Sequence, residues 1–234
     1  MITTRRHEDR GHSKYGGWLD SRHSFSFAHY HDPDHMGFGP LRVINEDNVL
    51  GGAGFDGHGH RDMEIISYVI DGALEHKDSM GNGSVIRAGD VQRMSAGTGV
   101  MHSEYNASQT DPVHFLQIWI EPHATRLAPG YAQKSFADIS PADGLVLVVS
   151  GDGRGGSLSM NRDADVYLAA LEDGTMLSQA LRPNRQAWLH VISGNVRVNG
   201  QDLSSGDAVA IRQEEGIAVT GTGDAKILLF DLEA

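Results

Sequence analysis

Hydrophobic and polar residues alternate over short stretches of this chain, as they do in β-strands that bury one face and expose the other. Turns separate the stretches, for example at Asp71-Gly72, a pair of residues that favours tight hairpins. The 29 glycines fit a fold of many short strands. The pattern predicts strands at residues 24–29, 41–45, 65–70, 113–121, 145–149, 166–171 and 187–192. We therefore expect an all-β protein.

A weak internal repeat relates residues 67–97 to residues 188–216. Each segment runs strand, Gly-containing turn, strand, second Gly-containing turn, short strand, Gly-Asp and strand. Two copies of one β-unit imply two similar β-barrels in tandem. We expect an N-terminal domain over residues 1–125, a linker over residues 126–143 and a C-terminal domain over residues 144–234.

Two pairs of candidate metal ligands stand in Gly-rich sequence, at His58-Gly59-His60 and His102-Ser103-Glu104. Residues two apart on a β-strand point to the same face, roughly 6.6 Å apart along the chain. Two such pairs on neighbouring strands converge on one point. Three imidazoles and one carboxylate suit a divalent transition metal such as Fe, Mn, Co, Ni or Zn. The second repeat has His190 as its only histidine, so a site with these four ligands cannot be built there.

Other histidines and aromatic residues have simpler explanations than metal or substrate binding. The spacing of one histidine cluster suits a loop better than one strand face, so we expect these side chains in a pocket wall: His23, His29, His31 and His35. Four phenylalanines fit a hydrophobic core better than a substrate contact: Phe25, Phe27, Phe38 and Phe115.

Composition and charge exclude several classes of function. The net charge of −12 disfavours binding to the phosphate backbone of nucleic acid. Cysteine is absent, which removes disulfides and thiolate ligands. No apolar run is long enough for a membrane span, and no secretory signal follows the basic N-terminal residues, so we expect a cytoplasmic protein. Two G-x-G-x-x-G matches, at residues 52–57 and 151–156, lack the strand-turn-helix context of a dinucleotide site, so we expect no such cofactor.

The sequence around the candidate ligands resembles the cupin motifs. The first motif fits as Gly52, five residues, His58-x-His60, three residues and Glu64. The second fits from Gly99, with two residues before His102 and three more before Asn106. The departures are an extra residue before the closing glycine of the first motif, and a serine where proline is usual in the second.

These departures are themselves features of the pirin family, which the chain resembles over nearly its whole length. The resemblance is carried by residues 23–47 (HSFSFAHYHDPDHMGFGPLRVINED), 58–82 (HGHRDMEIISYVIDGALEHKDSMGN), 94–106 (MSAGTGVMHSEYN) and 115–120 (FLQIWI). It is nearest to the bacterial pirin-like quercetin 2,3-dioxygenases. One difference is Gly59, where proline is common.

The resemblance implies a bicupin, meaning two tandem jelly-roll barrels, with one metal in the N-terminal barrel. The metal is usually Fe(II) in this family, and Zn, Co, Ni, Mn and Cu are the alternatives. The implied ligands are His58, His60, His102 and Glu104, which leaves Glu64 outside the ligand set. The implied reaction opens the central ring of a flavonol with dioxygen and releases carbon monoxide. Glu104 would accept the proton of the flavonol 3-hydroxyl.

Two other functions are compatible with the same resemblance. Some pirins act as metal- or redox-responsive partners of transcription regulators, and in such a protein the metal would tune a protein-binding surface without turnover. A storage or structural cupin is the third reading, which the intact ligand set disfavours. Turnover of quercetin by the iron-loaded protein would distinguish the dioxygenase from the regulatory pirin.

Overall fold

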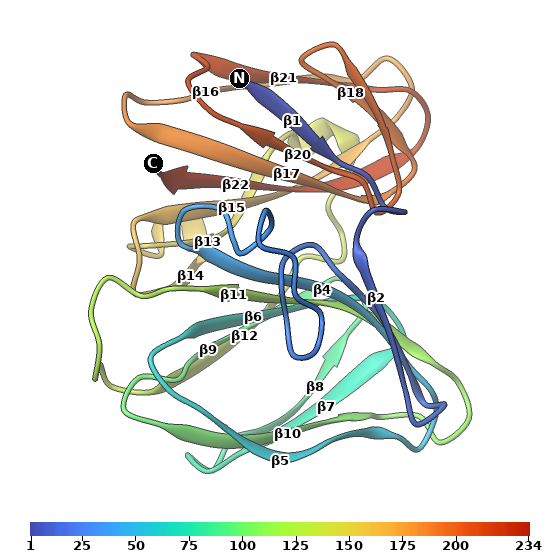
Figure 1. The fold of residues 1–234 in the computed structure, drawn as a ribbon, viewed down its shortest axis with the longest axis vertical. Coiled ribbons are helices and arrows are strands. Elements are labelled where there is room, and N and C mark those ends of the chain that lie inside the picture. The colour runs from blue at the N-terminus through green and yellow to red at the C-terminus, as the bar shows by residue number, and fades with distance from the viewer. The chain divides into compact units, whose positions relative to one another are not determined.

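The computed structural model describes all residues, 1–234, and is built from β-strands apart from two short 3-10 helices. The chain forms two compact units, each with one seven-stranded and one four-stranded sheet (Figure 1). The all-β prediction and the prediction of two similar β-barrels are therefore confirmed. None of the helices has the length and apolar character needed to cross a bilayer.

The first unit, here called the N-terminal unit, comprises Gly11–Asp138 and Met160–Arg162. Its seven-stranded sheet has the order β12-β9-β6-β11-β4-β3-β2, and its four-stranded sheet has the order β5-β10-β7-β8. The strands are β2 (Gly11–Tyr15), β3 (Leu19–His23), β4 (Leu41–Val49), β5 (Gly54–His60), β6 (Glu64–Asp71), β7 (Ala73–Asp78), β8 (Gly83–Arg87), β9 (Asp90–Ser95), β10 (Val100–Asn106), β11 (Val113–Ile120) and β12 (Gly130–Ser135).

Strand β11 shows how the N-terminal unit combines an apolar core with a polar interior. It lies between β4 and β6, and all three pair antiparallel. Val113 and Phe115 belong to a buried apolar cluster. Two residues further on the same face, Gln117 contacts a buried carboxylate, and Trp119 lines a cavity. The inward face of one strand thus changes from core to site along its length.

The second unit, here called the C-terminal unit, comprises Ile139–Ser159, Asp163–Ala234 and also Met1–Arg10. Its sheets have the orders β1-β20-β17-β22-β15-β13-β14 and β16-β21-β18-β19. The elements are β1 (Ile2–Arg5), η1 (Pro141–Asp143), β13 (Val146–Ser150), η2 (Arg154–Gly156), β14 (Leu158–Ser159), β15 (Ala164–Leu171), β16 (Met176–Ala180), β17 (Arg185–Ser193), β18 (Asn195–Val198), β19 (Gln201–Ser204), β20 (Ala208–Ile211), β21 (Gly216–Gly221) and β22 (Ala225–Glu233).

The repeat seen in the sequence is a structural repeat. Strands β6 to β9 and strands β17 to β20 follow the same course, with a hairpin (β7·β8 or β18·β19) in the four-stranded sheet. Gly72 and Gly194 occupy the equivalent turns with φ values of 79° and 77°. A Cβ at either position would collide with backbone of a neighbouring loop, so only glycine fits both turns.

Three sequence-based expectations differ from the structure. The first ten residues belong to the C-terminal unit, because β1 pairs with β20 rather than with a strand of the expected first domain. Within the expected linker, Gly130–Ser135 form β12, which pairs with β9. Residues 24–29 are not a strand, because Phe27 and Tyr30 close a tight turn in which Ala28 has φ 50°.

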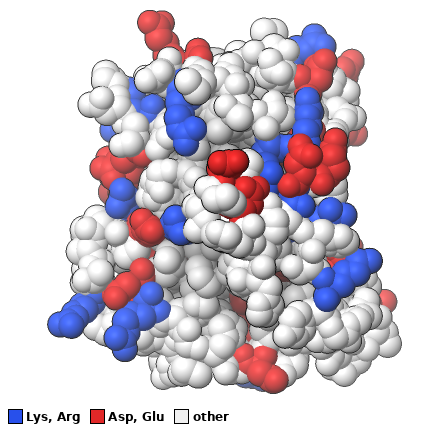
Figure 2. Space-filling view, viewed as in Figure 1, with Lys and Arg blue, Asp and Glu red and all other residues white.

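Charged side chains of both signs are mixed on the face of the molecule drawn in Figure 2. In Figure 2, Lys and Arg side chains lie beside Asp and Glu side chains and do not gather into one basic patch on the face drawn. The expectation that the protein does not bind nucleic acid rests on the net charge of −12 and stays a prediction.

Candidate metal centre

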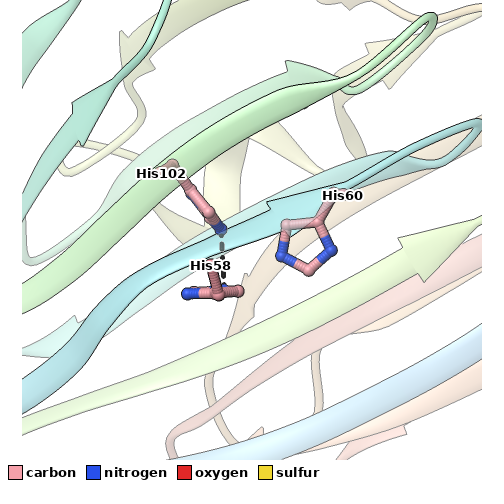
Figure 3. A group of neighbouring side chains, drawn as sticks. All are labelled: His58, His60 and His102. Atoms are coloured by element: carbon pink, nitrogen blue, oxygen red, sulfur yellow. Dashed lines mark hydrogen bonds between the residues drawn. The ribbon is translucent and has the colours of Figure 1, made fainter.

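Strands β5 and β10 bring three histidines together. They pair antiparallel with His58 opposite His102 and His60 opposite Val100. The imidazole of His58 points toward that of His102, with their Nε2 atoms 3.0 Å apart, and His60 lies beside both (Figure 3). The ring centre of His60 is 4.8 Å from each of the other two rings. The two strands therefore converge as the spacing predicts.

Glu104 lies behind these rings, in the interior of the barrel. Its carboxylate is buried, and Gln117 Nε2 donates a 2.7 Å hydrogen bond to Oε2. The hydroxyl of Ser67 lies 3.3 Å from Oε1. Potential ligand atoms within 4.8 Å of one another form two overlapping groups, His58/His60/His102 and His76/His102/Glu104. The structure thus divides the predicted ligands between two triads that share His102, and it adds His76.

The electrostatics of the site favour neutral imidazoles. Burial, with His58 adding to it, lowers the pKa of His60 to about 4. Burial and then the neighbouring histidines lower the pKa of His102 to about 3. Burial raises the pKa of Glu104 to about 7, although Ser67 and Gln117 oppose the shift. A cation beside that carboxylate would favour its ionised form.

The donor set fits a divalent transition metal. Metal binding requires deprotonated ligands, and the imidazoles of His60 and His102 are neutral at physiological pH without a metal. The facing Nε2 atoms of His58 and His102 either share a proton or turn their lone pairs toward a common cation. Imidazole and carboxylate ligands together suit Fe, Mn, Co, Ni or Zn.

A cavity of about 290 Å³ opens onto His58, His60 and Glu104. Its apolar walls include the rings Trp18, Phe27, Phe55 and Trp119. Trp119 stands edge-on to His60, with ring centres 4.9 Å apart, and Phe27 stands edge-on to Trp119 at 5.4 Å. Aromatic walls with a few polar groups are typical of a small-molecule site.

The predictions for the other histidines and for the phenylalanines are confirmed in part. Of the four histidines expected in a pocket wall, His23 and His29 line the cavity, whereas His31 and His35 do not. His23 contacts Asn45 at 2.8 Å and Ser13 at 3.0 Å. Among the four phenylalanines, the core assignment is confirmed for Phe25, Phe38 and Phe115. It is wrong for Phe27, which faces the cavity because the turn after it directs its ring toward Trp119.

Glu64, the other carboxylate of the cupin-like motif, has different neighbours. It is buried at the start of β6, where Ser95 Oγ donates to Oε2 at 2.7 Å and Asn161 Nδ2 donates to Oε1 at 2.9 Å. It belongs to neither triad. Because its carboxylate joins Ser95 to Asn161 and lies outside both groups of potential ligands, we expect Glu64 to have a structural role.

Sequence reasoning missed three polar residues next to the site, namely Ser67, His76 and Gln117. Ser67 and Gln117 are opposite each other on β6 and β11, and both contact Glu104. Their place depends on strand register, which the sequence does not show. His76 could have been found, because His76-Lys77-Asp78 has the same spacing of two as the other ligand pairs.

The equivalent positions of the C-terminal unit carry aliphatic side chains. In β7 and β10, His76 is opposite Glu104, and in β18 and β21, Val198 is opposite Val219. The same register matches His102 to Ile217. Valine and isoleucine cannot ligate a metal, and here they belong to a buried apolar cluster. The absence of a metal site from this unit stays a prediction.

Comparison with known proteins identifies the family. Residues 4–120 match the family model described as Pirin, and residues 147–232 match the one described as Quercetinase C-terminal cupin domain. The chain is 46% identical to a protein of Escherichia coli K12 named quercetin 2,3-dioxygenase, over 99% of both chains.

Solved structures give the same result. A structure described as bacterial pirin YhhW of Escherichia coli in complex with nickel(II) is 45% identical, has a TM-score of 0.95, and is matched over 100% of this chain and 99% of that one. A quercetin 2,3-dioxygenase of Acinetobacter baumannii has a TM-score of 0.79 at 20% identity, with 99% and 85% of the two chains covered, and shows the fold alone. The tandem-cupin chain described here belongs to the pirin family.

Proposed function

We propose that this protein is a metal-dependent dioxygenase that opens the central ring of flavonols such as quercetin. The observation that carries the proposal is the position of the histidine triad, two of whose members, His58 and His60, line a cavity with aromatic walls. The name of the 46% identical relative, quercetin 2,3-dioxygenase, supports the reaction type.

His58, His60, His102 and Glu104 hold the metal in this proposal. The nickel(II) complex of the 45% identical relative supports a divalent ion, and we propose Fe(II) as the ion used for turnover. When bound, the ion acts as a Lewis acid that favours the deprotonated form of a ligated hydroxyl. Four protein ligands leave at least one position open on a five- or six-coordinate ion, as a catalytic site requires.

The aromatic wall selects a flat substrate. Trp18, Phe27, Phe55 and Trp119 offer ring faces and edges on the sides of the cavity, and a planar aromatic molecule gains most from such contacts. Because His58 and His60 also line the cavity, a ring held by this wall would present its oxygen substituents to the ligand histidines. The cavity volume of about 290 Å³ admits a single small molecule.

Glu104 is the proton acceptor for the flavonol 3-hydroxyl. A carboxylate within reach of the reacting hydroxyl can act as its general base, and the buried Glu104 lines the same cavity as His58 and His60. The amide of Gln117 holds Oε2 and thereby fixes the orientation of the carboxylate. The reaction balances as one flavonol and one dioxygen giving one depside and one carbon monoxide.

The test measures quercetin and carbon monoxide together. Protein stripped of metal and reloaded with Fe(II) is expected to release one carbon monoxide for each quercetin consumed. The double variant His58→Ala/His60→Ala is the matched control and is expected to release none. Iron bound in stoichiometric amount by the wild type without quercetin turnover would contradict the enzyme proposal and favour a regulatory pirin that binds a protein partner.

A further inference from the structure

Four buried polar residues form a two-by-two grid on β7 and β10. His76 is opposite Glu104, and Asp78 is opposite His102. All four side chains point into the barrel and are almost completely buried. His102 and Glu104 belong to the proposed metal centre, whereas His76 and Asp78 are not among its four proposed ligands.

The carboxylate of Asp78 is a fixed acceptor. The N–H groups of Met80 and Asn82 donate to Oδ1 at 2.9 and 3.0 Å. The amide of Asn82 donates to Oδ2 at 2.8 Å, and His76 Nε2 lies 3.2 Å from the same oxygen. An ionised carboxylate only accepts hydrogen bonds, so Nε2 of His76 must carry a proton.

The proton on Nε2 of His76 determines the tautomer of His76 and, through it, that of His102. The ring of His76 is fully buried, and burial favours a neutral imidazole, so Nδ1 of His76 carries a lone pair. This atom faces Nδ1 of His102 at 3.5 Å, where two lone pairs or two N–H groups would repel. Nδ1 of His102 therefore carries a proton, and its Nε2 lone pair faces Nε2 of His58 at 3.0 Å.

We propose that Asp78 and His76 form a relay that fixes His102 in the tautomer able to bind the metal through Nε2. The inference rests on the proposed metal centre and goes beyond it, because it assigns two positioning residues. Partners behind a ligand histidine commonly fix its orientation and tautomer. Tyr131 stacks on His76 with ring centres 4.9 Å apart, which holds the relay ring in place.

The first variant is Asp78→Asn, which keeps the size of the side chain and reverses the relay. The backbone N–H groups of Met80 and Asn82 require an oxygen at one end of the amide, so its NH₂ must face His76. His76 then carries its proton on Nδ1, and His102 is driven to the tautomer whose Nε2 is protonated. We expect Zn²⁺ affinity, measured by competition with a chromophoric chelator, to fall by at least about 10- to 100-fold.

A double-mutant cycle distinguishes the relay from a structural role for the turn at residues 78–82. His76→Phe keeps a ring against Tyr131 but removes both nitrogens, and we expect weaker Zn²⁺ binding in this variant as well. In the His76→Phe background, Asp78→Asn should change affinity by less than about twofold, because Asp78 acts through His76. If Asp78→Asn lowers Zn²⁺ affinity by the same factor with and without His76→Phe, the two residues act independently and the proposal is overturned.

The matched control is Glu46→Gln. Glu46 accepts from His114 at 3.0 Å on strands β4 and β11, away from the two triads. The Glu46→Gln variant removes a histidine–carboxylate pair of the same kind as His76–Asp78, and we expect its Zn²⁺ affinity to be unchanged. Thermal unfolding of every variant checks that lost affinity does not reflect lost folding.

A direct readout is the tautomer of His102, observed by ¹⁵N NMR of the imidazoles with and without Zn²⁺. We expect the Nδ1–H tautomer in the wild type and the Nε2–H tautomer in metal-free Asp78→Asn. The same tautomer in both would overturn the relay. The comparison of the two metal-free proteins needs no Zn²⁺ and no substrate, so failure of the relay is distinguishable from a wild type that binds no Zn²⁺ or that does not turn over quercetin.

Discussion

Two buried glutamates show how neighbours decide the role of a residue. Glu104 stands beside His76 and His102, two potential metal ligands, and accepts hydrogen bonds from Gln117 and Ser67. Glu64 accepts from Ser95 and from Asn161 and lies in neither triad. Each is nearly inaccessible to solvent. The neighbouring histidines therefore favour a ligand role for Glu104, whereas the contacts of Glu64 favour a structural role.

The paired variants Glu104→Gln and Glu64→Gln test this difference. We expect Glu104→Gln to lose most bound metal, because it removes the only anionic ligand, and to lower turnover by at least about 10²-fold, because it removes the proton acceptor. Glu64→Gln should keep its metal and lose at most about 10- to 100-fold in rate. Metal per chain and flavonol turnover are measured for both. The reverse pattern, with metal lost only from Glu64→Gln, would mean that the ordinary cupin ligand set is right.

At the scale of elements, the N-terminal strand depends on one carboxylate. Strand β1 pairs with β20, and the segment after it is held by Asp207, which accepts from the N–H of His7 and from Arg6, both at 2.8 Å. Burial alone would raise the pKa of Asp207, but the hydrogen bonds from Ser204, His7 and Arg6 hold it below its usual value. The ionised form is therefore the one that stabilises the fold.

We expect Asp207→Asn to lower the free energy of unfolding by about 1–3 kcal/mol at pH 7, the usual range for a hydrogen-bonded charged group. A pKa lowered by folding means that the stabilisation is present above the ordinary Asp value of 3.8 and is lost as the pH falls below it. The difference between wild type and variant should therefore shrink in acid. Urea unfolding at several pH values measures this difference in the free energy of unfolding. Hydrogen exchange of residues 2–5 shows whether the N-terminal strand is the part that is destabilised.

The control for this prediction is Asp202→Asn. Asp202 forms an exposed ion pair with Arg197, and such pairs contribute little. Its effect should stay within about 0.5 kcal/mol at every pH. An equal loss in both variants, or a loss in Asp207→Asn that does not depend on pH, would contradict the role given to Asp207.

Elements with clear alternation could be predicted from the sequence, and the others could not. Strands β4 and β11 were predicted because their apolar residues repeat along the strand. Strand β12 was missed because its sequence, GYAQKS, is polar and largely solvent-facing. The pairs at residues 58–60 and 102–104 were found because both members lie on one strand. Their partners Ser67 and Gln117 come from other strands, so only the register reveals them.

At the scale of the whole molecule, the two units have the same strand arrangement but enclose different side chains. The repeat matches His76, His102 and Glu104 to Val198, Ile217 and Val219. His190 is nearly inaccessible on β17 of the C-terminal unit, in which sixteen residues form one buried apolar cluster. The two units therefore share strands and turns but differ in the chemistry of the side chains that they enclose.

His190→Ala should leave bound metal at the wild-type level, because His190 lies in the C-terminal unit and in neither triad. His58→Ala/His60→Ala should reduce bound metal to background. Metal per chain is measured on folded protein purified without a metal-affinity tag. Loss of metal from folded His190→Ala would show that the C-terminal unit contributes to the site.

The most direct test of the metal centre is a crystal structure of the metal-loaded protein with anomalous data collected at the absorption edge of the metal. We predict one anomalous peak per chain, within bonding distance of His58, His60, His102 and Glu104. His76 should lie outside that distance, with Nδ1 facing Nδ1 of His102. A peak held by His76, His102 and Glu104 without His58 and His60, or a peak in the C-terminal unit, would contradict the account.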